Sequence, residues 1–304
     1  MVILKKIWGA IIEPRKMMFH LNVRGFLNWM SDSAHVRLMY RLKLDKKLNL
    51  DNPQTFSEKL QWLKLHDRNP MYTKMVDKYE VREYIKEKLG EEYLIPLLGA
   101  YDSFDEIDFD ELPTQFVLKC THDSGGLVIC KDKSKLDLKQ AKKKIKKSFK
   151  RKYYYHSREW PYKNVKPRII CEKYMVDESG MELKDYRLFC FNGVPRFVAV
   201  DFSITDKTKT RRNLYDMDWG LMEEGITYPR VLVKNVQKPA KFDEMVKLSK
   251  ILSKDIPHVR IDFYEINGKV YFGEMTFYHQ SGFGRIYPEE FDYKMGSWIE
   301  LPSR

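Results

Sequence analysis

The chain has 304 residues, which is enough for one large domain or two with a sizeable core. Hydrophobic residues make up 43% and charged residues 32%, which excludes a disordered chain, and no apolar run approaches the ~20 residues of a membrane span. The net charge of +12 indicates acidic partners: nucleotides, anionic polysaccharide, nucleic acid or an anionic membrane surface.

The first 70 residues are predicted to be helical. Lys5 and Lys6 precede the short apolar run IWGAII, and no small-residue cleavage site follows it. A packed first helix is therefore favoured over a signal peptide, with a short amphipathic surface helix at the membrane as the alternative. Ser33 is expected to cap the next helix. Thr55 and Glu58 form a capping box that opens another one.

One continuous helix is predicted over residues 72–89, with apolar residues at helical spacing, Lys78 within it and Gly90 as its C-cap. The residues from Pro113 to Lys119 form a clear strand that ends in a lysine. Together these segments bring two lysines ahead of the first glycine-rich loop.

The sequence CTHDSGG follows Lys119 and leads into a second apolar strand over residues 127–130. Glycines let backbone N–H groups approach phosphate oxygens, and lysine supplies the opposite charge. This arrangement suits a phosphate-binding flap, although it is not a Walker A loop because no GK[ST] follows. An ordinary hairpin is the alternative interpretation.

Residues 137–152 form a strongly basic helix, and the aromatic segment YYYHSREW follows it. Basic residues beside aromatic rings are typical of surfaces that bind nucleic acid or acidic sugar chains. A solvated helix face is the competing interpretation. The strand 168–175 follows. A second hairpin comes next, over residues 182–202, with Asn192-Gly193 at its turn.

The loop over residues 204–213 is long, basic and poor in apolar residues, as a mobile substrate or phosphate loop would be. Its four cationic residues are Lys207, Lys209, Arg211 and Arg212. A helix over 241–256 then precedes the last hairpin.

The cysteines have neither metal-ligand spacing nor a dense disulfide pattern, and each lies in an apolar strand-like run. They are Cys120, Cys130, Cys171 and Cys190. Buried free thiols in a reducing cytosol are therefore expected.

The rest of the chain is organised around the hairpin at residues 258–285. Asn267-Gly268 predicts a two-residue type I′ turn, and Asp262 and Glu274 are expected to face each other across the hairpin. Arg260 and Thr276 share the face of these carboxylates because strand side chains alternate. Paired carboxylates on a rigid hairpin suit Mg²⁺ with substrate phosphates, and a solvated face with a cross-strand salt bridge is the alternative.

The order of these elements resembles the ATP-grasp superfamily. The runs NPQTFSEKLQWLK, VLKCTHDSGG, DYRLFCFNG and GEMTFYHQSGFG resemble its TupA-like branch, which is associated with teichuronopeptide and capsular polysaccharide gene products. The resemblance runs from about Asn52 to about Trp298. It implies an α+β ATP-grasp fold, with ATP clasped between two antiparallel α+β subdomains and a helical N-terminal extension.

The domains that this implies are a helical extension (1–70), a pre-ATP-grasp region (71–112), a lid subdomain (113–175) and a C-terminal subdomain with the metal hairpin (176–304).

The resemblance also implies a nucleotide site. Lys78 is similar to the first phosphate-side lysine, and Lys119 to the lysine that contacts the α-phosphate. The flap residues are His122, Ser124, Gly125 and Gly126. The adenine hinge is Glu172, Lys173 and Met175, with the Glu172 side chain toward the adenine amino group and the backbone of the other two along the adenine edge. The candidates for the carboxylate that holds the ribose are Glu178, Glu182 and Asp185.

The same resemblance implies that Asp262, Glu274 and Thr276 bind Mg²⁺, and that Arg260 and Arg285 stabilise the oxyanion. Many ATP-grasp ligases have asparagine where Thr276 stands. The stretch HQSG at 279–282 replaces the usual substrate-facing loop, which leaves the substrate open.

The expected activity is an ATP- and Mg²⁺-dependent carboxylate–amine ligase that acts through an acyl phosphate. The expected substrates are an acidic, uronic acid-type sugar or polysaccharide precursor and an amino acid or other amine, with no nucleic acid partner. The expected location is the cytoplasm, with possible peripheral contact at the inner membrane face. The alternatives are a kinase on the same scaffold, a glycosyltransferase, as some family members are labelled, and a non-catalytic polyanion-binding protein.

Overall fold

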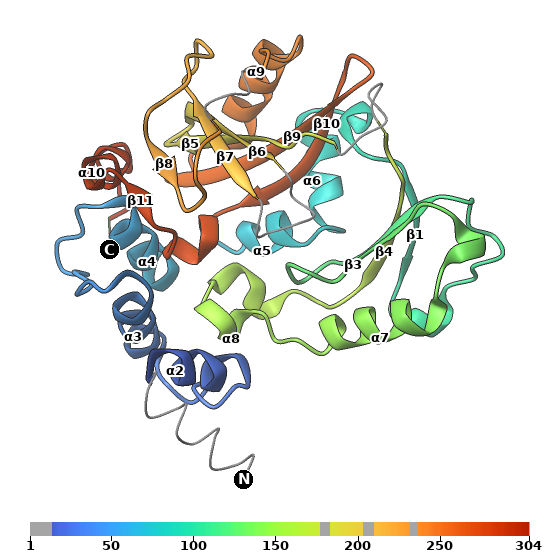
Figure 1. Cartoon of the computed structure of the whole chain (residues 1–304), viewed down its shortest axis with the longest axis horizontal. Coiled ribbons are helices and arrows are strands. Elements are labelled where there is room, and N and C mark those ends of the chain that lie inside the picture. Colours follow the sequence, from blue (N-terminus) through green and yellow to red (C-terminus); the bar gives the residue numbers. More distant parts are fainter. Residues whose placement is uncertain (1–13, 177–182, 203–209, 232–235, 304) are drawn as a thin grey trace.

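The computed structural model describes residues 14–176, 183–202, 210–231 and 236–303 of the chain. It consists of two antiparallel sheets with helices packed around them, which confirms the expected α+β class (Figure 1). Within these ranges no helix is both long enough and apolar enough to cross a membrane.

The α-helices of the described residues are α2 (Pro14–Val23), α3 (Asp32–Leu44), α4 (Phe56–His66), α5 (Met71–Val76), α6 (Val81–Lys88), α7 (Leu138–Phe149), α8 (Tyr154–Ser157), α9 (Phe242–Leu252) and α10 (Glu289–Ser297). Short 3₁₀ segments separate several of them: η1 (Glu91–Tyr93), η2 (Phe104–Glu106), η3 (Lys133–Lys135), η4 (Trp160–Asn164) and η5 (His279–Gly282).

The smaller sheet, which we call sheet A, has the strand order β1-β4-β2-β3. Its strands are β1 (Leu97–Tyr101), β2 (Phe116–Cys120), β3 (Leu127–Cys130) and β4 (Ile169–Lys173). The basic helix α7 packs its apolar stripe on this sheet and forms a separate core with it. β1 therefore belongs to the same sheet as β2 to β4, although it precedes the boundary expected at residue 113.

The larger sheet, sheet B, has the order β10-β9-β5-β6-β7. Its strands are β5 (Tyr186–Phe191), β6 (Val194–Phe202), β7 (Arg211–Tyr215), β9 (His258–Ile266) and β10 (Lys269–Thr276); a further short pair joins β8 (Gly225–Ile226) to β11 (Ile286–Tyr287). Both expected Asn-Gly turns are present with positive φ at both residues, 44° and 78° at Asn192-Gly193 and 51° and 72° at Asn267-Gly268. The type I′ prediction at Asn267-Gly268 and the predicted hairpin turn at Asn192-Gly193 are confirmed.

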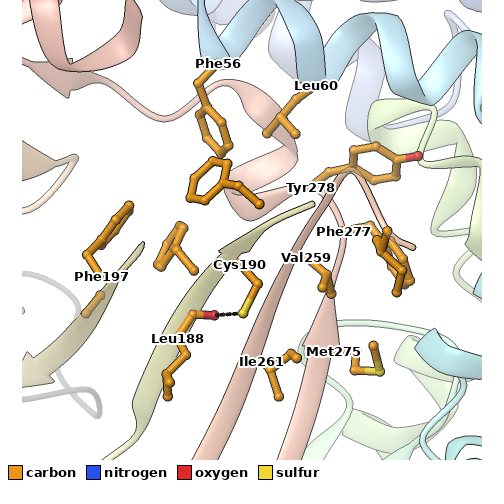
Figure 2. Close-up of a cluster of buried hydrophobic side chains, with 14 of the residues drawn as sticks. Phe56, Leu60, Leu188, Cys190, Phe197, Val259, Ile261, Met275, Phe277 and Tyr278 are labelled. Carbon is orange, nitrogen blue, oxygen red and sulfur yellow. Dashed lines mark hydrogen bonds between the residues drawn. The ribbon is translucent and has the colours of Figure 1, made fainter. Parts of the chain in front are cut away.

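The helical extension packs against sheet B, and their side chains form one core. The Phe56 ring of α4 lies 4.8 Å from the ring of His258 and 5.9 Å from that of Phe191. Figure 2 shows Phe56 and Leu60 pointing from α4 toward the sheet, where Leu188 and Cys190 lie on strand β5. α9 contacts β5, β6 and β9, and thus also helps to cover this sheet.

Local capping signals set the helix boundaries. The capping box between Thr55 and Glu58 is present as predicted, and both of its hydrogen bonds form. The prediction of Ser33 as a cap was wrong by two residues, because the Ser31 hydroxyl accepts the hydrogen bond from the backbone N–H of Ala34.

The prediction of one helix over 72–89 was also wrong, since the chain breaks between α5 and α6. The Asp77 carboxylate accepts a hydrogen bond from the N–H of Tyr79 at 2.9 Å and so offers the backbone an alternative to the helix. The N–H of Lys78 donates to the Thr121 carbonyl at 3.3 Å instead. This break places Lys78 in a turn that contacts the end of β2. α6 ends at Lys88 with Leu89 as its C-cap, one residue before the predicted Gly90, whose φ is +119°.

Candidate functional site

A cavity of about 690 Å³ lies between sheet A, sheet B and the α5–α6 turn, which is within the usual size of small-molecule sites. It collects nine of the site residues that the sequence predicted: Lys78, Lys119, Ser124, Gly125, Gly126, Glu172, Asp185, Asp262 and Glu274. We call it the first chamber. These residues come from segments up to 196 positions apart (Lys78 to Glu274: 274 − 78 = 196) and meet only because the two sheets face each other.

The two carboxylates of the last hairpin face each other only because of a β-bulge. With the turn at Asn267-Gly268, a regular antiparallel register would place Glu274 opposite Ile261, on the other face of the sheet. The register shifts between Phe272 and Glu274, and Glu274 is therefore paired with Asp262. Gly273 occupies the shift, and a Cβ there would lie 3.0 Å from the Asp262 carbonyl oxygen.

Arg260 lies between these two carboxylates. Its Nη2 donates to Asp262 Oδ2 at 2.7 Å and to Glu274 Oε1 at 2.6 Å, while the Thr276 hydroxyl donates to the same Glu274 oxygen at 3.2 Å. Burial raises the pKa of Asp262, and the neighbouring Glu274 adds to this. Burial also acts to raise the pKa of Glu274, but Arg260 and Lys78 outweigh it and leave that pKa lowered.

The donor set fits a hard cation. Asp262, Glu274 and Thr276 offer carboxylate and hydroxyl oxygens on one sheet face, which is what Mg²⁺ requires. Two carboxylates are few for a dedicated metal cage, and among the described residues no group of three or more His, Cys, Asp and Glu side chains is placed to hold a metal. The residues present therefore fit a Mg²⁺ that is held jointly by protein and substrate phosphates.

Lys78 is held directly at the flap. Its Nζ donates to the Asp123 carbonyl at 2.8 Å, and the Asp123 carboxylate accepts the Gly126 N–H at 3.2 Å. A Cβ on Gly126 would lie 2.5 Å from Ser148 Oγ and 2.7 Å from the Cys120 side chain, so glycine is required for this approach. His122 does not line the chamber, because its ring packs edge-on against Phe149 of α7.

Glu172 is part of an ion-pair cluster on the wall formed by sheet A. Lys119 Nζ lies 2.6 Å from Glu172 Oε2, and Arg82 Nη1 lies 3.1 Å from Glu172 Oε1. The N–H of Lys173 donates to the Pro96 carbonyl at 3.0 Å and is thus already used. Neither Lys173 nor Met175 lines the chamber, so the structure does not bring these two predicted residues to it.

Asp185 has a free acceptor beside the chamber. Its Oδ2 pairs with Arg187 Nη2 at 2.8 Å, while its buried Oδ1 has no hydrogen-bond partner. The Asp185 charge, followed by burial, holds the pKa of Tyr264 well above its usual range. The other two ribose candidates, Glu178 and Glu182, lie outside the described residues.

A second chamber of about 300 Å³ adjoins the first and shares Lys78, Ser124, Tyr162, Arg187 and Glu274 with it. The predicted residues Arg260 and Thr276 line this one. Its other polar lining comes from sheet B and the residue before β7, from the segments after α7 and β8, and from the region of η5: Tyr153, Glu159, Asp201, Thr210, Arg212, Tyr228, Tyr278, His279, Gln280 and Ser281.

The basic loop expected at 204–213 contributes through its end alone, as far as the structure describes it. Lys207 and Lys209 lie outside the described residues, and Arg211 and Arg212 begin β7. Arg212 is 2% exposed, and its Nε and Nη2 donate to the Asp201 carboxylate at 2.5 and 2.8 Å. Arg212 is therefore a fixed wall of the second chamber.

Arg285 is not brought into either chamber: it is exposed on the segment between η5 and β11. The sequence analysis missed Arg82 and Arg187 as site residues. Arg187 could have been found, because it lies two residues after Asp185 on the same strand face and opposite Asp262 in the register. The placement of Arg82 depends on the unexpected break at Asp77, and local patterns did not reveal it.

Comparison with known proteins gives one family match. The TupA-like ATPgrasp family matches residues 58–300, which is most of the chain. No curated protein matches it.

Several solved structures are similar to this chain. D-alanine–D-alanine ligase from Bacillus anthracis, complexed with ATP, has 16% identity and a TM-score of 0.41, over 68% of this chain and 56% of that one. The D-alanine–D-alanine ligase from Helicobacter pylori has 14% identity and a TM-score of 0.41, over 80% of this chain and 69% of that one. The D-cycloserine synthetase DcsG has 13% identity and a TM-score of 0.37, over 68% of this chain and 64% of that one. The chain thus spans less than two thirds of the Bacillus anthracis ligase and of DcsG.

Proposed function

Because this chain belongs to the TupA-like ATP-grasp family, we propose that it is an ATP- and Mg²⁺-dependent ligase that joins a carboxylate to an amine. The observation that carries the proposal is the pairing of Asp262 and Glu274, which a bulge turns toward the same cavity that contains Lys78 and Lys119. Two acidic side chains for a cation and two lysines for phosphates are the groups that a bound Mg-nucleotide requires.

ATP would lie in the first chamber. Lys78 and Lys119 would leave their present partners, the Asp123 carbonyl and Glu172, to contact phosphate oxygens. The Oδ1 of Asp185, which lacks a partner, would accept a hydrogen bond from a ribose hydroxyl. Asp262, Glu274 and Thr276 would hold Mg²⁺, which neutralises phosphate charge when bound.

The reaction has two steps. A substrate carboxylate oxygen attacks the γ-phosphorus, the bond from that phosphorus to the bridging oxygen of ADP breaks, and ADP leaves. The amine nitrogen then attacks the acyl carbon, the carbon–oxygen bond to phosphate breaks, and the amine proton leaves with phosphate or water. Arg260 lines the second chamber and donates to Glu274, which lines both chambers. Arg260 would stabilise the oxyanion of the second step.

The flap would protect the acyl phosphate from water by closing over Lys78. The contact between Lys78 Nζ and the Asp123 carbonyl supports this role, because it shows that the flap comes within hydrogen-bond distance of the α5–α6 turn.

The substrates that we propose are an acidic, uronic acid-type sugar and an amino acid, used in surface polysaccharide biosynthesis in the cytoplasm. The four tyrosines of the second chamber support a sugar because tyrosine offers an apolar ring face and a hydroxyl together. The net charge of +12 favours an acidic partner.

Trapping with hydroxylamine tests the proposal against a kinase on the same scaffold. The protein is incubated with Mg-ATP and a set of uronic acids, with and without hydroxylamine, and ADP and hydroxamate are measured. A ligase gives both products in a carboxylate-dependent manner, because hydroxylamine attacks an acyl phosphate. ADP release with phosphate on a sugar hydroxyl and no hydroxamate would assign a kinase. The variant Asp262→Asn should lose both products.

A further inference from the structure

In the second chamber, the hydrogen-bonding groups of His279 do not match those of its two neighbours. The His279 ring lies between two guanidinium groups: its Nδ1 is 2.7 Å from Arg260 Nη1, and its Nε2 is 2.9 Å from Arg212 Nη1. A guanidinium has only donors, whereas a neutral imidazole has one acceptor and one N–H. At one of the two contacts, an N–H of His279 therefore faces an N–H of arginine and no acceptor is present. If the ring were protonated, both contacts would be of this kind.

The surroundings keep this conflict in place. His279 is 3% exposed and cannot turn to water, and its ring packs edge-on against Phe189 at 4.9 Å. Asp201 fixes Arg212 from the opposite side, and Asp262 fixes Arg260 through Nε and Nη2. An acceptor at the two Nη1 groups would relieve the conflict, because one arginine could donate to it and leave a single acceptor contact to His279.

Charged side chains of both signs line the second chamber. Four cationic groups line it, Lys78, Arg187, Arg212 and Arg260. Three carboxylates face them, Glu159, Asp201 and Glu274. The Arg212 guanidinium carbon lies 5.0 Å from the centroid of the Tyr228 ring, so this ring covers one face of the guanidinium.

We propose that Arg212, Arg260 and His279 form the clamp for the carboxylate of a sugar acid, the substrate that the ligase activates. This deepens the proposed function and rests on it. The clamp lies on the chamber that adjoins the ATP cavity at Lys78 and Glu274, where a bound carboxylate would meet the terminal phosphate. A chamber of about 300 Å³ is at the small end of ligand sites, which suits a single sugar unit.

Binding of D-glucuronate, with D-glucose as the probe that lacks a carboxylate, tests the clamp. Thermal shift and calorimetry are run on the full chain, with and without Mg-ATP, for the wild type, Arg212→Lys and the matched control Arg211→Lys. Arg211 is the adjacent arginine and lines neither chamber. We expect glucuronate but not glucose to bind, about tenfold weaker binding in Arg212→Lys because the Nη1 donor is lost, and no change in the control.

Two results would overturn the clamp. One is wild-type protein that binds Mg-ATP but not glucuronate, and the other is Arg212→Lys that binds glucuronate as wild type does. In both cases intact Mg-ATP binding would leave the proposed function standing, whereas its absence from the wild type would count against that function itself. Should Arg212→Lys not fold, isotope-labelled histidine spectra of the wild type decide: glucuronate must shift the signal that His279→Gln removes, and an unshifted signal refutes the clamp.

A separate observation concerns the surface of the helical extension. The end of α2 and the turn that follows it expose three apolar side chains at every third position, Val23 by 69%, Phe26 by 61% and Trp29 by 83%. Backbone hydrogen bonds of the i to i+3 type at Gly25 and Asn28 stack residues three apart on one side of the turn. Arg158 fixes the segment by donating to the carbonyls of Leu27, Asn28 and Met30, so the exposure belongs to a well-anchored structure.

We also infer that this turn docks on an anionic lipid bilayer. The stretch from residue 14 to residue 31 contains Arg15, Lys16 and Arg24 and no acidic residue. Arg15 pairs with Asp45 at 2.7 Å, and Arg24 complements anionic headgroups. Aromatic side chains such as Phe26 and Trp29 favour the membrane interface. Residues 1–13, which include the apolar run IWGAII, lie outside the described residues.

Vesicle co-sedimentation tests the docking surface. The full chain is mixed with vesicles of phosphatidylglycerol and phosphatidylcholine, or of phosphatidylcholine alone, at low and high salt. We expect salt-sensitive binding to the anionic vesicles, lost in Phe26→Ser/Trp29→Ser and retained in Tyr293→Ser, which alters another exposed aromatic (51%). Absence of vesicle binding, or equal binding by the double variant, would overturn the inference. A wild-type dimer that the double variant turns into a monomer would assign the surface to a second copy instead.

Discussion

Acid should destabilise this protein through His258, a histidine buried at the junction of α4 and sheet B. His258 is 2% exposed, its Nδ1 lies 2.9 Å from the Cys190 carbonyl, and its Nε2 is buried without a partner. Burial, helped by Arg260, lowers the pKa of His258 to about 3. Below pH ~6.5, His258 therefore binds a proton in the unfolded chain but stays neutral in the folded chain, and the free energy of unfolding falls as the pH falls.

The magnitude follows from the two pKa values. Between pH 7.5 and 5.5 the unfolded histidine gains its proton while the folded one stays neutral, which costs about 1.4 kcal/mol. Loss of the hydrogen bond to Cys190 in His258→Phe lowers stability at both pH values and cancels in the comparison. We therefore expect the pH dependence of the unfolding free energy to be about 1.4 kcal/mol smaller in His258→Phe than in the wild type.

Urea unfolding at pH 7.5 and 5.5 on both proteins measures this difference, and all other titrating groups cancel in it. His20 is exposed, and His20→Gln serves as the control that should keep the wild-type pH dependence. An equal pH dependence in wild type and His258→Phe would refute the reasoning, since it would mean that the buried ring takes up its proton in the folded state.

Three further substitutions test the packing and charge arguments. Gly273→Ala should cost about 1–3 kcal/mol in urea unfolding, because its Cβ would crowd the Asp262 carbonyl at 3.0 Å; a neutral result would mean that the bulge has space for a side chain. Arg187→Met should cost about 3–5 kcal/mol, because it removes the common partner of Asp185 and of the buried Asp201 and Asp262, and a loss below about 1 kcal/mol would contradict that role. Phe56→Ala should cost about 3–5 kcal/mol by opening a cavity between α4 and sheet B, and thermal unfolding checks it against Phe26→Ala, which should be nearly neutral.

Local signals in the sequence predicted the local structure well. The capping box at Thr55 and the two Asn-Gly turns depend on neighbours within four residues, and the structure contains all three. The break at Asp77 also has a local cause, the carboxylate that accepts the N–H of Tyr79, but it competes with a strong helical pattern. The apolar spacing outweighed it in the prediction.

The site was predictable only in part, because much of it is made by tertiary contacts. The facing carboxylates depend on a bulge at Gly273, and a simple count along the hairpin places Glu274 on the wrong face. Arg212 and His279 are 67 residues apart and meet at 2.9 Å through the register of sheet B and the path of η5. No spacing rule reveals such a contact, whereas the pair of Asp185 and Arg187, which the prediction missed, could have been found from strand alternation.

Nucleotide binding by thermal shift tests the central claim most directly. Wild type and the double variant Asp262→Asn/Glu274→Gln are heated with ATP alone and with Mg-ATP. A ligand at 100-fold over its Kd that binds only the folded state adds about 2.7 kcal/mol, which is a visible shift. We predict a Mg²⁺-dependent shift in the wild type, which the double variant loses while it keeps a smaller, metal-independent shift. A wild type that ATP does not stabilise, or a double variant that responds to Mg-ATP as fully as the wild type, would contradict it.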